Sequence, residues 1–425
     1  MNDKLIWTTV QKSVKDLLPN SKNPRKISDK QMSDLKKSLD NYNLVEIPAI
    51  DTDGTLVAGH QRIKALQLLG RENEVIDVRI PNRKLTQDEA ESYMIASNAL
   101  GGDWDFTLLK NFKPEFLIDV GFDITKLSNF WDKNTKAKDE VFDENKELED
   151  IKEPTTKTGD LIILGDHRLV CGDSNNSDVL RKLFETERAS MIMSDPLYNI
   201  NLDYRRGVGG KQDYGVDIDD NKDETEYIKF LRTNIQNALS FVKDDCHVFY
   251  WNTEQQIWMI QTLFREAGVV NKRVCLWVKN GQNPTPQIAF SKCYEPCIYG
   301  TIGKPYLSDG EAGQNEVLNK ELSTGNDLVK DVSERTNLWA VKRLKSNEYE
   351  HATSKPVNLY EKPIKRCTKL GDIVLDTFAG SGSIMIAGEQ LGRKIYMVEK
   401  EPVFCDLIVK RYENFTGKKA KVIRD

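Results

Sequence analysis

The last third of the chain constrains the fold most, because apolar strand-like runs alternate there with helix-like runs. Residues 372–378 and 394–400 predict strands, and residues 383–392 and 402–415 predict helices. Such alternation is typical of a mainly parallel sheet with helices on both faces, so we predict a doubly wound α/β fold. Upstream, the sequence predicts a β-hairpin at 160–174 and strands at 189–195, 247–252 and 272–279.

A glycine-rich turn, Phe378–Gly382, lies between the first strand and the first helix of this series. Gly380 and Gly382 allow a tight turn and a close approach of a ligand to the backbone. Asp376 can accept hydrogen bonds from such a ligand, and Glu399 can accept both hydroxyls of a ribose. The turn lacks the GxGxxG spacing of dinucleotide sites, so an adenosine-containing ligand without a pyrophosphate fits better. An ordinary turn with a structural aspartate is the alternative.

Length and composition limit the class of protein. The 425 residues are too many for one compact core and predict two or three domains. With 61 basic and 66 acidic residues, the net charge of -5 argues against indiscriminate coating of nucleic acid, although a local basic groove is compatible with it. Seven scattered Cys and four His predict reduced thiols and no metal site. Because neither a membrane-span-length apolar run nor a signal-peptide core is found, we expect a cytoplasmic protein.

Composition also divides the chain into segments. Residues 1–85 mix short strands with helices and predict a small α+β domain, and residues 86–131 predict a helical connector. Residues 132–157 are polar and mildly acidic, which is the composition of a mobile linker. The α/β series then occupies residues 158–425.

The C-terminal segment resembles the cofactor-binding block of DNA amino-methyltransferases. In that family an H-x-x-x-K-P segment precedes an F-x-G-x-G turn, and an acidic residue ends the next strand. The resemblance implies S-adenosylmethionine as the cofactor, with Glu399 on its ribose, Phe378 and Gly380 lining the pocket, and residues 351–356 facing its methionine end. Ser383 stands where the family usually has Thr. The matching residues are His351, Lys355, Pro356, Asp376, Phe378, Gly380, Gly382 and Glu399.

Asp195-Pro196-Leu197-Tyr198 resembles the D-P-P-Y motif of the same family, which marks methylation of exocyclic amines and chiefly of adenine N6. The resemblance implies that the Asp195 carboxylate and the Pro196 carbonyl accept the two amine N–H groups and stabilise the positive charge of the attacking nitrogen. Tyr198 would stack on a base flipped out of the duplex. A strand-ending turn with a half-buried tyrosine is the alternative.

Leu197 departs from that motif, and the departure leaves other functions open. Leu197 frees one backbone dihedral that a second proline would fix, so we expect a less rigid loop and, at worst, lowered or conditional activity. A DNA-binding adaptor with a weak or inactive methylase domain is one alternative. Methylation of cytosine N4 is another, because relatives of that kind more often have Ser in the first position and Ser194 precedes Asp195. An RNA substrate is a third.

The order of the motifs resembles the circularly permuted beta class of these enzymes. Asp195–Tyr198, which we call the acceptor motif, precedes the glycine turn, and this order implies a target-recognition region at about residues 200–350. Relatives of this class are often homodimers. Asp173 in "LVCGDS" matches a further family segment and would contact the cofactor adenine, unless it is a turn carboxylate. Double-stranded DNA would contact a glycine-rich loop that carries Arg205, Arg206 and Lys211, although a solvated charged surface is an equal alternative.

The N-terminal segment resembles the ParB-like domain of partition proteins. Asn23-Pro24-Arg25 and Gly59-His60-Gln61-Arg62 match its two marked segments. In that family the second segment contacts nucleotide phosphates at a helix N-terminus, which implies a nucleotide triphosphate near Arg25, Gly59, His60 and Arg62. His60 and Gln61 replace a Glu and an Arg of the family pattern, so nucleotide hydrolysis is not expected. We expect a regulatory or DNA-positioning module; salt bridges within a small domain are the alternative role for Arg25 and Arg62.

Overall fold

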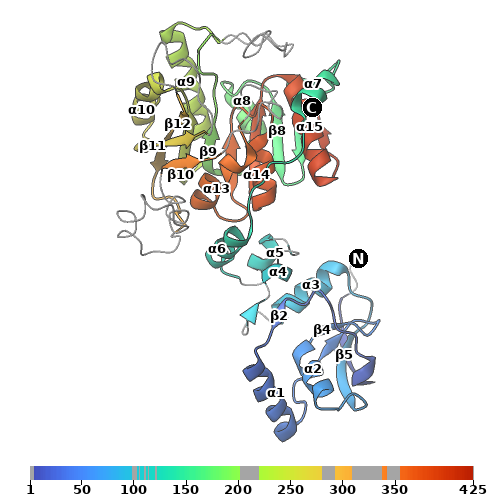
Figure 1. The fold of residues 1–425 in the computed structure, drawn as a ribbon. Helices are drawn as coiled ribbons and strands as arrows, with labels where there is room; N and C mark the ends of the chain where they lie inside the picture. Colours follow the sequence, from blue (N-terminus) through green and yellow to red (C-terminus); the bar gives the residue numbers. More distant parts are fainter. Residues whose placement is uncertain are drawn as a thin grey trace, which may run out of the picture. The chain divides into compact units, whose positions relative to one another are not determined.

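The computed structural model divides the chain into two compact units, Met1–Phe130 and Trp131–Asp425 (Figure 1). Each unit is described by itself. The structure describes residues 4–97, 103–104, 106–109, 112, 114–119, 122–201, 220–279, 292–308, 337–341 and 355–424.

The N-terminal unit contains a four-stranded sheet in the order β1-β5-β3-β4. Its strands are β1 (Trp7–Ser13), β3 (Ala49–Ile50), β4 (Leu56–Ala58) and β5 (Val75–Pro81), and its longer helices are α1 (Asp29–Tyr42), α2 (His60–Leu68) and α3 (Gln87–Ala96). A compact cluster that includes Leu39, Ile50, Ile63 and Val78 forms its core. Shorter elements of the unit are η1 (Val14–Asp16), β2 (Arg25–Lys26), β6 (Asp103–Trp104), α4 (Phe106–Leu109) and α5 (Pro114–Asp119), and α6 (Ile124–Asn134) crosses the boundary between the units.

The C-terminal unit is built on a ten-stranded sheet in the order β13-β11-β12-β10-β9-β14-β15-β8-β7-β16. Its central strands β10, β9, β14, β15 and β8 are mutually parallel, and antiparallel pairs flank them. The strands are β7 (Leu161–Leu164), β8 (His167–Cys171), β9 (Ala189–Ser194), β10 (Val242–Trp251), β11 (Val270–Val278), β12 (Tyr294–Ile302), β13 (Leu338–Ala340), β14 (Ile373–Asp376), β15 (Lys394–Glu399) and β16 (Lys421–Ile423).

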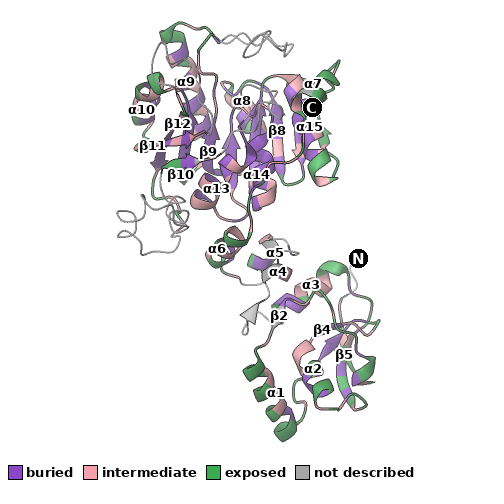
Figure 2. Ribbon diagram, in the orientation of Figure 1, coloured by how far each residue is buried: buried purple, intermediate pink, exposed green. Residues whose placement is uncertain are grey.

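Helices cover both faces of this sheet. On one face α8 (Ser177–Phe184), α9 (Glu224–Leu239) and α10 (Ile257–Glu266), which follows the short η2 (Glu254–Gln256), pack against the strands. On the other face lie η3 (Val357–Tyr360), α13 (Glu361–Cys367), α14 (Ser383–Leu391) and α15 (Pro402–Thr416). Figure 2 shows buried positions along the central strands. The doubly wound α/β prediction is confirmed.

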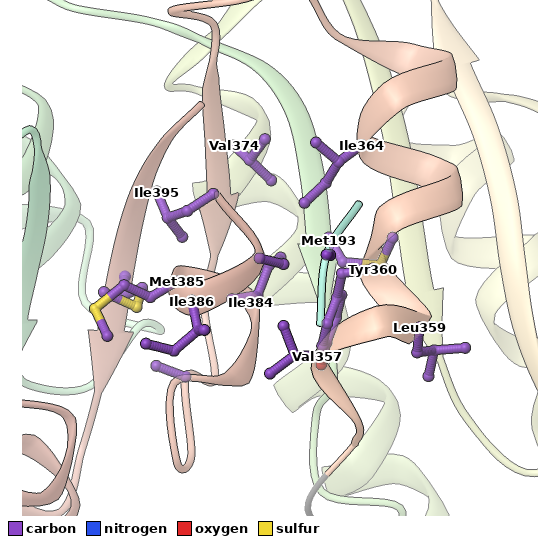
Figure 3. Packing of buried hydrophobic residues seen from close by; sticks show 14 of the residues in the cluster. Met193, Val357, Leu359, Tyr360, Ile364, Val374, Ile384, Met385, Ile386 and Ile395 are labelled. Atoms are coloured by element: carbon purple, nitrogen blue, oxygen red, sulfur yellow. The ribbon is translucent and has the colours of Figure 1, made fainter. Parts of the chain in front are cut away.

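Strand periodicity explains how two cores form from one sheet. Met191 and Met193 belong to the cluster beneath α13, α14 and α15, whereas Ile192 between them belongs to the cluster beneath α8, α9 and α10. Successive side chains of a strand point to opposite faces, so continuous apolar runs are needed where both faces are covered. Figure 3 shows the first cluster, in which Val374 and Ile395 of the sheet face α14.

Residues 135–157, which we call the strap, differ from the mobile linker that their composition predicts. The strap contains α7 (Glu144–Glu149) and packs against the rest of the C-terminal unit. Phe142 joins a small cluster with Phe404 and Leu407, and both Thr155 and Thr156 donate backbone hydrogen bonds to the Asp406 carboxylate, at 2.6 and 3.1 Å. Polar side chains of the strap form ion pairs and hydrogen bonds with buried groups of the unit, and the composition of the segment alone does not indicate such contacts.

No helix in the described part of the chain combines the length and apolar character that crossing a membrane requires.

Candidate active site

Three parallel strands end at one edge of the sheet and bring the sequence motifs together. β14 pairs with β9 on one side and with β15 on the other. Asp195 follows β9, Asp376 ends β14 and Glu399 ends β15. The hydroxyls of Ser194 and Thr377 lie 2.7 Å apart and connect the ends of β9 and β14. Motifs about 180 residues apart thus meet at the carboxyl ends of parallel strands, where open α/β sheets bind ligands.

Asp195, Tyr198 and Lys355 form one hydrogen-bonded cluster at this edge. The Tyr198 hydroxyl donates to Asp195 Oδ1 at 2.7 Å, and the Lys355 ammonium donates to Asp195 Oδ2 and to the Tyr198 oxygen, the latter at 3.1 Å. Burial and the neighbouring carboxylates hold the pKa of Tyr198 well above its usual value, so its hydroxyl remains a donor. The sequence resemblance assigns Lys355 to the cofactor, whereas the structure joins its ammonium to the acceptor motif.

Glu295 on β12 extends this cluster and was missed at the sequence level. Its Oε2 lies 3.9 Å from Lys355 Nζ, and Lys279 pairs with its other oxygen. Burial alone would raise the pKa of Glu295, but the ammonium groups of Lys355 and Lys279 outweigh it and lower that pKa. A carboxylate at the start of an apolar strand was the available signal. Lys355 is 6 % exposed and also lies over the Trp251 ring, 4.8 Å from its centroid.

The loop after Asp195 is held by hydrogen bonds at the position where the D-P-P-Y motif has a second proline. The Leu197 carbonyl accepts a 2.7 Å hydrogen bond from Tyr227 on α9, and Asn252 donates to the Tyr227 oxygen at 3.1 Å. Asn199 has a left-handed φ of 54°, and its N–H donates to Asp220 at 2.8 Å. These contacts give the loop a restraint that the lone Pro196 does not supply.

The glycine turn between β14 and α14 has the backbone conformation that its glycines permit. Gly380 and Gly382 have φ of 53° and 76°, in the left-handed region that other residues adopt at a cost. The Gly380 N–H donates to Glu399 Oε2 at 2.8 Å, and Phe378 N–H donates to Asp376 Oδ1 at 3.0 Å. A Cβ on Gly380 would meet nothing within 4 Å, so the space beside the turn is open.

Two buried carboxyl groups stand beside this turn. Asp376 is 4 % exposed and Glu399 is 8 % exposed. Burial raises the pKa of Glu399 to about 7, although its backbone N–H donors act in the opposite direction. Burial, together with the charges of Asp195 and Glu399, raises the pKa of Asp376 to about 8. Shifted carboxyl groups of this kind are frequent at functional sites.

The other predicted cofactor residues lie around the same edge. Pro356 is buried and precedes η3, and the Phe378 ring lies 5.8 Å from that of Phe230 on α9. The Ser383 hydroxyl accepts from Arg411 at 3.2 Å. Asp173 follows β8 and accepts from the N–H of Asn175 at 2.8 Å, as a turn carboxylate does, while the adjacent Gly172 N–H donates to the Glu399 carbonyl.

Several predicted residues are not brought into this site. His351, Arg205, Arg206 and Lys211 lie outside the described residues, as does the side chain of Arg25. The remaining three belong to the N-terminal unit. Gly59, with a φ of 89°, precedes α2, and Arg62 forms a salt bridge with Glu46, which is the alternative that its sequence left open.

His60 begins α2, and its Nε2 accepts from Asn20 N–H at 3.4 Å. Burial lowers the pKa of His60 to about 4, so it is neutral near pH 7 and adds no positive charge for a phosphate. Within the described ranges, no group of three or more His, Cys, Asp or Glu side chains is arranged to hold a metal ion.

Comparison with known proteins places this site in a family. The model of the N6/N4 DNA methylases matches residues 189–410, which span half of the chain, from β9 to α15. The chain belongs to this DNA methylase family.

Two type II methyltransferases and one solved structure are similar to this chain. The chain is 26% identical over 242 residues to the type II methyltransferase M2.MboI of Moraxella bovis, covering 55% of this chain and 84% of that protein. It is 27% identical over 262 residues to M2.DpnII of Streptococcus pneumoniae, covering 58% and 90%. Among solved structures, M1.HpyAVI in complex with SAM has a TM-score of 0.41 at 20% identity, covering 57% of this chain and 97% of that one.

The N-terminal unit has a weaker match. A Pnob8-like ParB-N domain has a TM-score of 0.21 at 15% identity, covering 31% of this chain and 48% of that one. A match with this TM-score and identity does not establish the fold of the N-terminal unit, so the ParB-like resemblance stays a prediction.

Proposed function

We propose that this chain transfers a methyl group from S-adenosylmethionine to adenine N6 in double-stranded DNA. The observation that carries the proposal is the meeting of the Asp195–Tyr198–Lys355 cluster with the glycine turn and Glu399 at adjacent strand ends. The open space beside Gly380 and a buried carboxylate that can accept two hydroxyls fit an adenosine-containing cofactor. Gly380, Asp376 and Glu399 would hold it, with Phe378 and Pro356 beside it.

When bound, S-adenosylmethionine supplies an electrophilic methyl group on a sulfonium. The task of the chain is to orient the lone pair of an amine that is otherwise delocalised into the base. Asp195 and the Pro196 carbonyl accept its two N–H groups, which favours a pyramidal nitrogen and stabilises its developing positive charge. The amine oriented by these two acceptors would receive the methyl group that the cofactor supplies, and the methylated nitrogen would lose one proton to solvent.

The unliganded cluster is compatible with this task. Lys355 and Tyr198 each use one oxygen of Asp195, but a carboxylate offers about four lone-pair sites, so an amine N–H can be added without loss of either donor. Tyr198 is anchored at its hydroxyl, which fixes the ring that would stack on the flipped base.

The burial of Ser194 favours methylation of adenine N6 over methylation of cytosine N4. Its side chain is 0 % exposed and faces Thr377, so the first acceptor at the site is Asp195. An enzyme with Asp at this position is expected to act on adenine, by the resemblance to D-P-P-Y proteins.

Nucleoside analysis tests this proposal. The full chain is incubated with methyl-labelled S-adenosylmethionine and with either duplex DNA of varied sequence or RNA, and the digested nucleosides are identified by mass spectrometry. We expect N6-methyladenine from the wild type and from the surface control Asp178→Asn. N4-methylcytosine would overturn the base assignment, label in RNA alone would overturn the DNA substrate, and binding without transfer would favour the adaptor alternative.

Three further roles remain proposals: that of the N-terminal unit, that of the DNA-contacting loop and that of the target-recognition region. We propose that the N-terminal unit positions DNA or regulates the methylase unit. Titration of a nucleotide triphosphate against the wild type and Arg62→Ala tests nucleotide binding, and absence of binding by the wild type would remove that partner. Sedimentation of the full chain tests the homodimer.

A further inference from the structure

We propose that two adjacent carboxylates of the strap, Asp139 and Glu140, position the two sides of the active site. The inference rests on the proposed function, because it concerns binding of S-adenosylmethionine and transfer of its methyl group. Both residues precede the part of the chain that the DNA methylase family model matches.

Asp139 holds the segment that carries Lys355. Its Oδ1 accepts a 2.6 Å hydrogen bond from the N–H of Val357, the residue after Lys355-Pro356. Two residues earlier, the Ala137 N–H donates to Glu361 on α13 at 2.7 Å. The strap therefore fixes the backbone from which the Lys355 ammonium reaches Asp195.

Glu140 holds the glycine turn through Arg411 on α15. The Nε–H group of Arg411 donates a hydrogen bond to Glu140, and Nη1 of Arg411 lies 2.9 Å from Glu144 of the strap. The same Nη1 donates to the Ser381 carbonyl at 2.8 Å, to the Ser381 hydroxyl at 3.1 Å and to the Ser383 hydroxyl at 3.2 Å. Ser381 is the residue between Gly380 and Gly382, so Arg411 joins the strap directly to the turn.

Physical reasons make this arrangement more than a surface contact. Arg411 is 5 % exposed, and a buried guanidinium requires charged partners, which the strap supplies. Hydrogen bonds to Asp376 and Glu399 already restrain the turn, and the contacts of Arg411 with Ser381 add a restraint that helps to preorganise it for a ligand.

The two carboxylates have different expected effects on catalysis. Glu140→Ala removes one of the two strap carboxylates that hold Arg411 and so loosens the glycine turn, and we expect the dissociation constant for S-adenosylmethionine to rise by roughly tenfold at nearly unchanged kcat. Glu140→Gln retains an acceptor and should restore most of the affinity. Asp139→Ala removes the acceptor of the Val357 N–H and loosens the Lys355 segment, so we expect a fall in kcat by about threefold to tenfold with a smaller change in cofactor affinity.

Titration calorimetry and steady-state kinetics on the full chain provide the test. Glu147→Gln is the matched control, since Glu147 lies on the same strap and pairs with Lys410 but does not contact the turn. Asp132→Asn controls for stability, since it removes a partner of the buried Arg393 and should lower Tm without changing cofactor affinity.

The possible outcomes separate this inference from the proposed function. Wild-type affinity and kcat in both Glu140→Ala and Asp139→Ala would overturn the inference alone. Equal loss of affinity in Asp132→Asn and Glu140→Ala would also overturn it, because the strap would then act only through stability. A wild type that binds no S-adenosylmethionine would overturn the proposed function and the inference with it.

Discussion

At the scale of single residues, Lys355 is the group whose role the structure changes most. Its sequence context assigns it to the cofactor, but its ammonium lies on Asp195 and Tyr198 and is backed by Glu295. An ammonium in this position fixes the orientation of the Asp195 carboxylate, which accepts the amine in the proposed mechanism. In the proposed mechanism Lys355 is thus a positioning residue for the Asp195 carboxylate.

Lys355→Met distinguishes the two assignments. We expect a fall in kcat by about tenfold or more, because a charge-assisted hydrogen bond to the acceptor carboxylate is lost, with cofactor affinity changed little. Steady-state kinetics and calorimetry together measure both quantities. The control is Lys243→Met, which removes a surface ion pair with Asp372. A large loss of cofactor affinity at wild-type kcat would instead place Lys355 at the cofactor.

At the scale of elements, the ends of β14 and β15 hold two carboxyl groups with raised pKa values. Burial raises the pKa of Glu399 to about 7 and that of Asp376 to about 8. In the unfolded chain both groups titrate near pH 4, so between these values the folded protein binds more protons. Its stability is therefore highest at low pH with respect to these groups and falls as the pH rises through about 7 to 8.

Thermal unfolding of the unliganded protein checks this sign. We expect Glu399→Gln to gain stability relative to the wild type as the pH is raised from about 5 to about 8, because the variant has no carboxylate to ionise. A pH-independent difference in Tm would contradict the raised pKa. The exposed Glu224→Gln on α9 serves as the control, since its carboxylate lies at the helix surface.

The same elements show what a sequence can predict here. The strands at 372–378 and 394–400 are recognisable because each is a short apolar run that alternates with a helix-like run, and the glycine turn follows from its place between the first strand and the first helix. Glu295 and the strap were not recognisable, because their partners are distant in sequence. In the sequence, a carboxylate that pairs with Arg411 or Lys355 cannot be distinguished from one that faces solvent. Only the fold shows that Glu140 pairs with a residue 271 positions away in the sequence.

At the scale of the whole molecule, the site is assembled from segments that span most of the C-terminal unit. Five segments contribute groups at or next to one edge of the sheet: the strap, the acceptor motif, β12, the segment with Lys355-Pro356 and the glycine turn. Topology makes this possible, because parallel order places the carboxyl ends of β9, β14 and β15 side by side. The N-terminal unit is a separate compact body with its own core.

A single-turnover measurement of methyl transfer by Asp195→Ala tests the central claim most directly. The full chain, saturated with S-adenosylmethionine and duplex DNA that contains the target adenine, is mixed and quenched, and N6-methyladenine is quantified. We predict that the rate falls by about 10²–10³ relative to the wild type while the dissociation constant for S-adenosylmethionine is unchanged. Transfer at the wild-type rate would contradict the assignment of Asp195 as the amine acceptor.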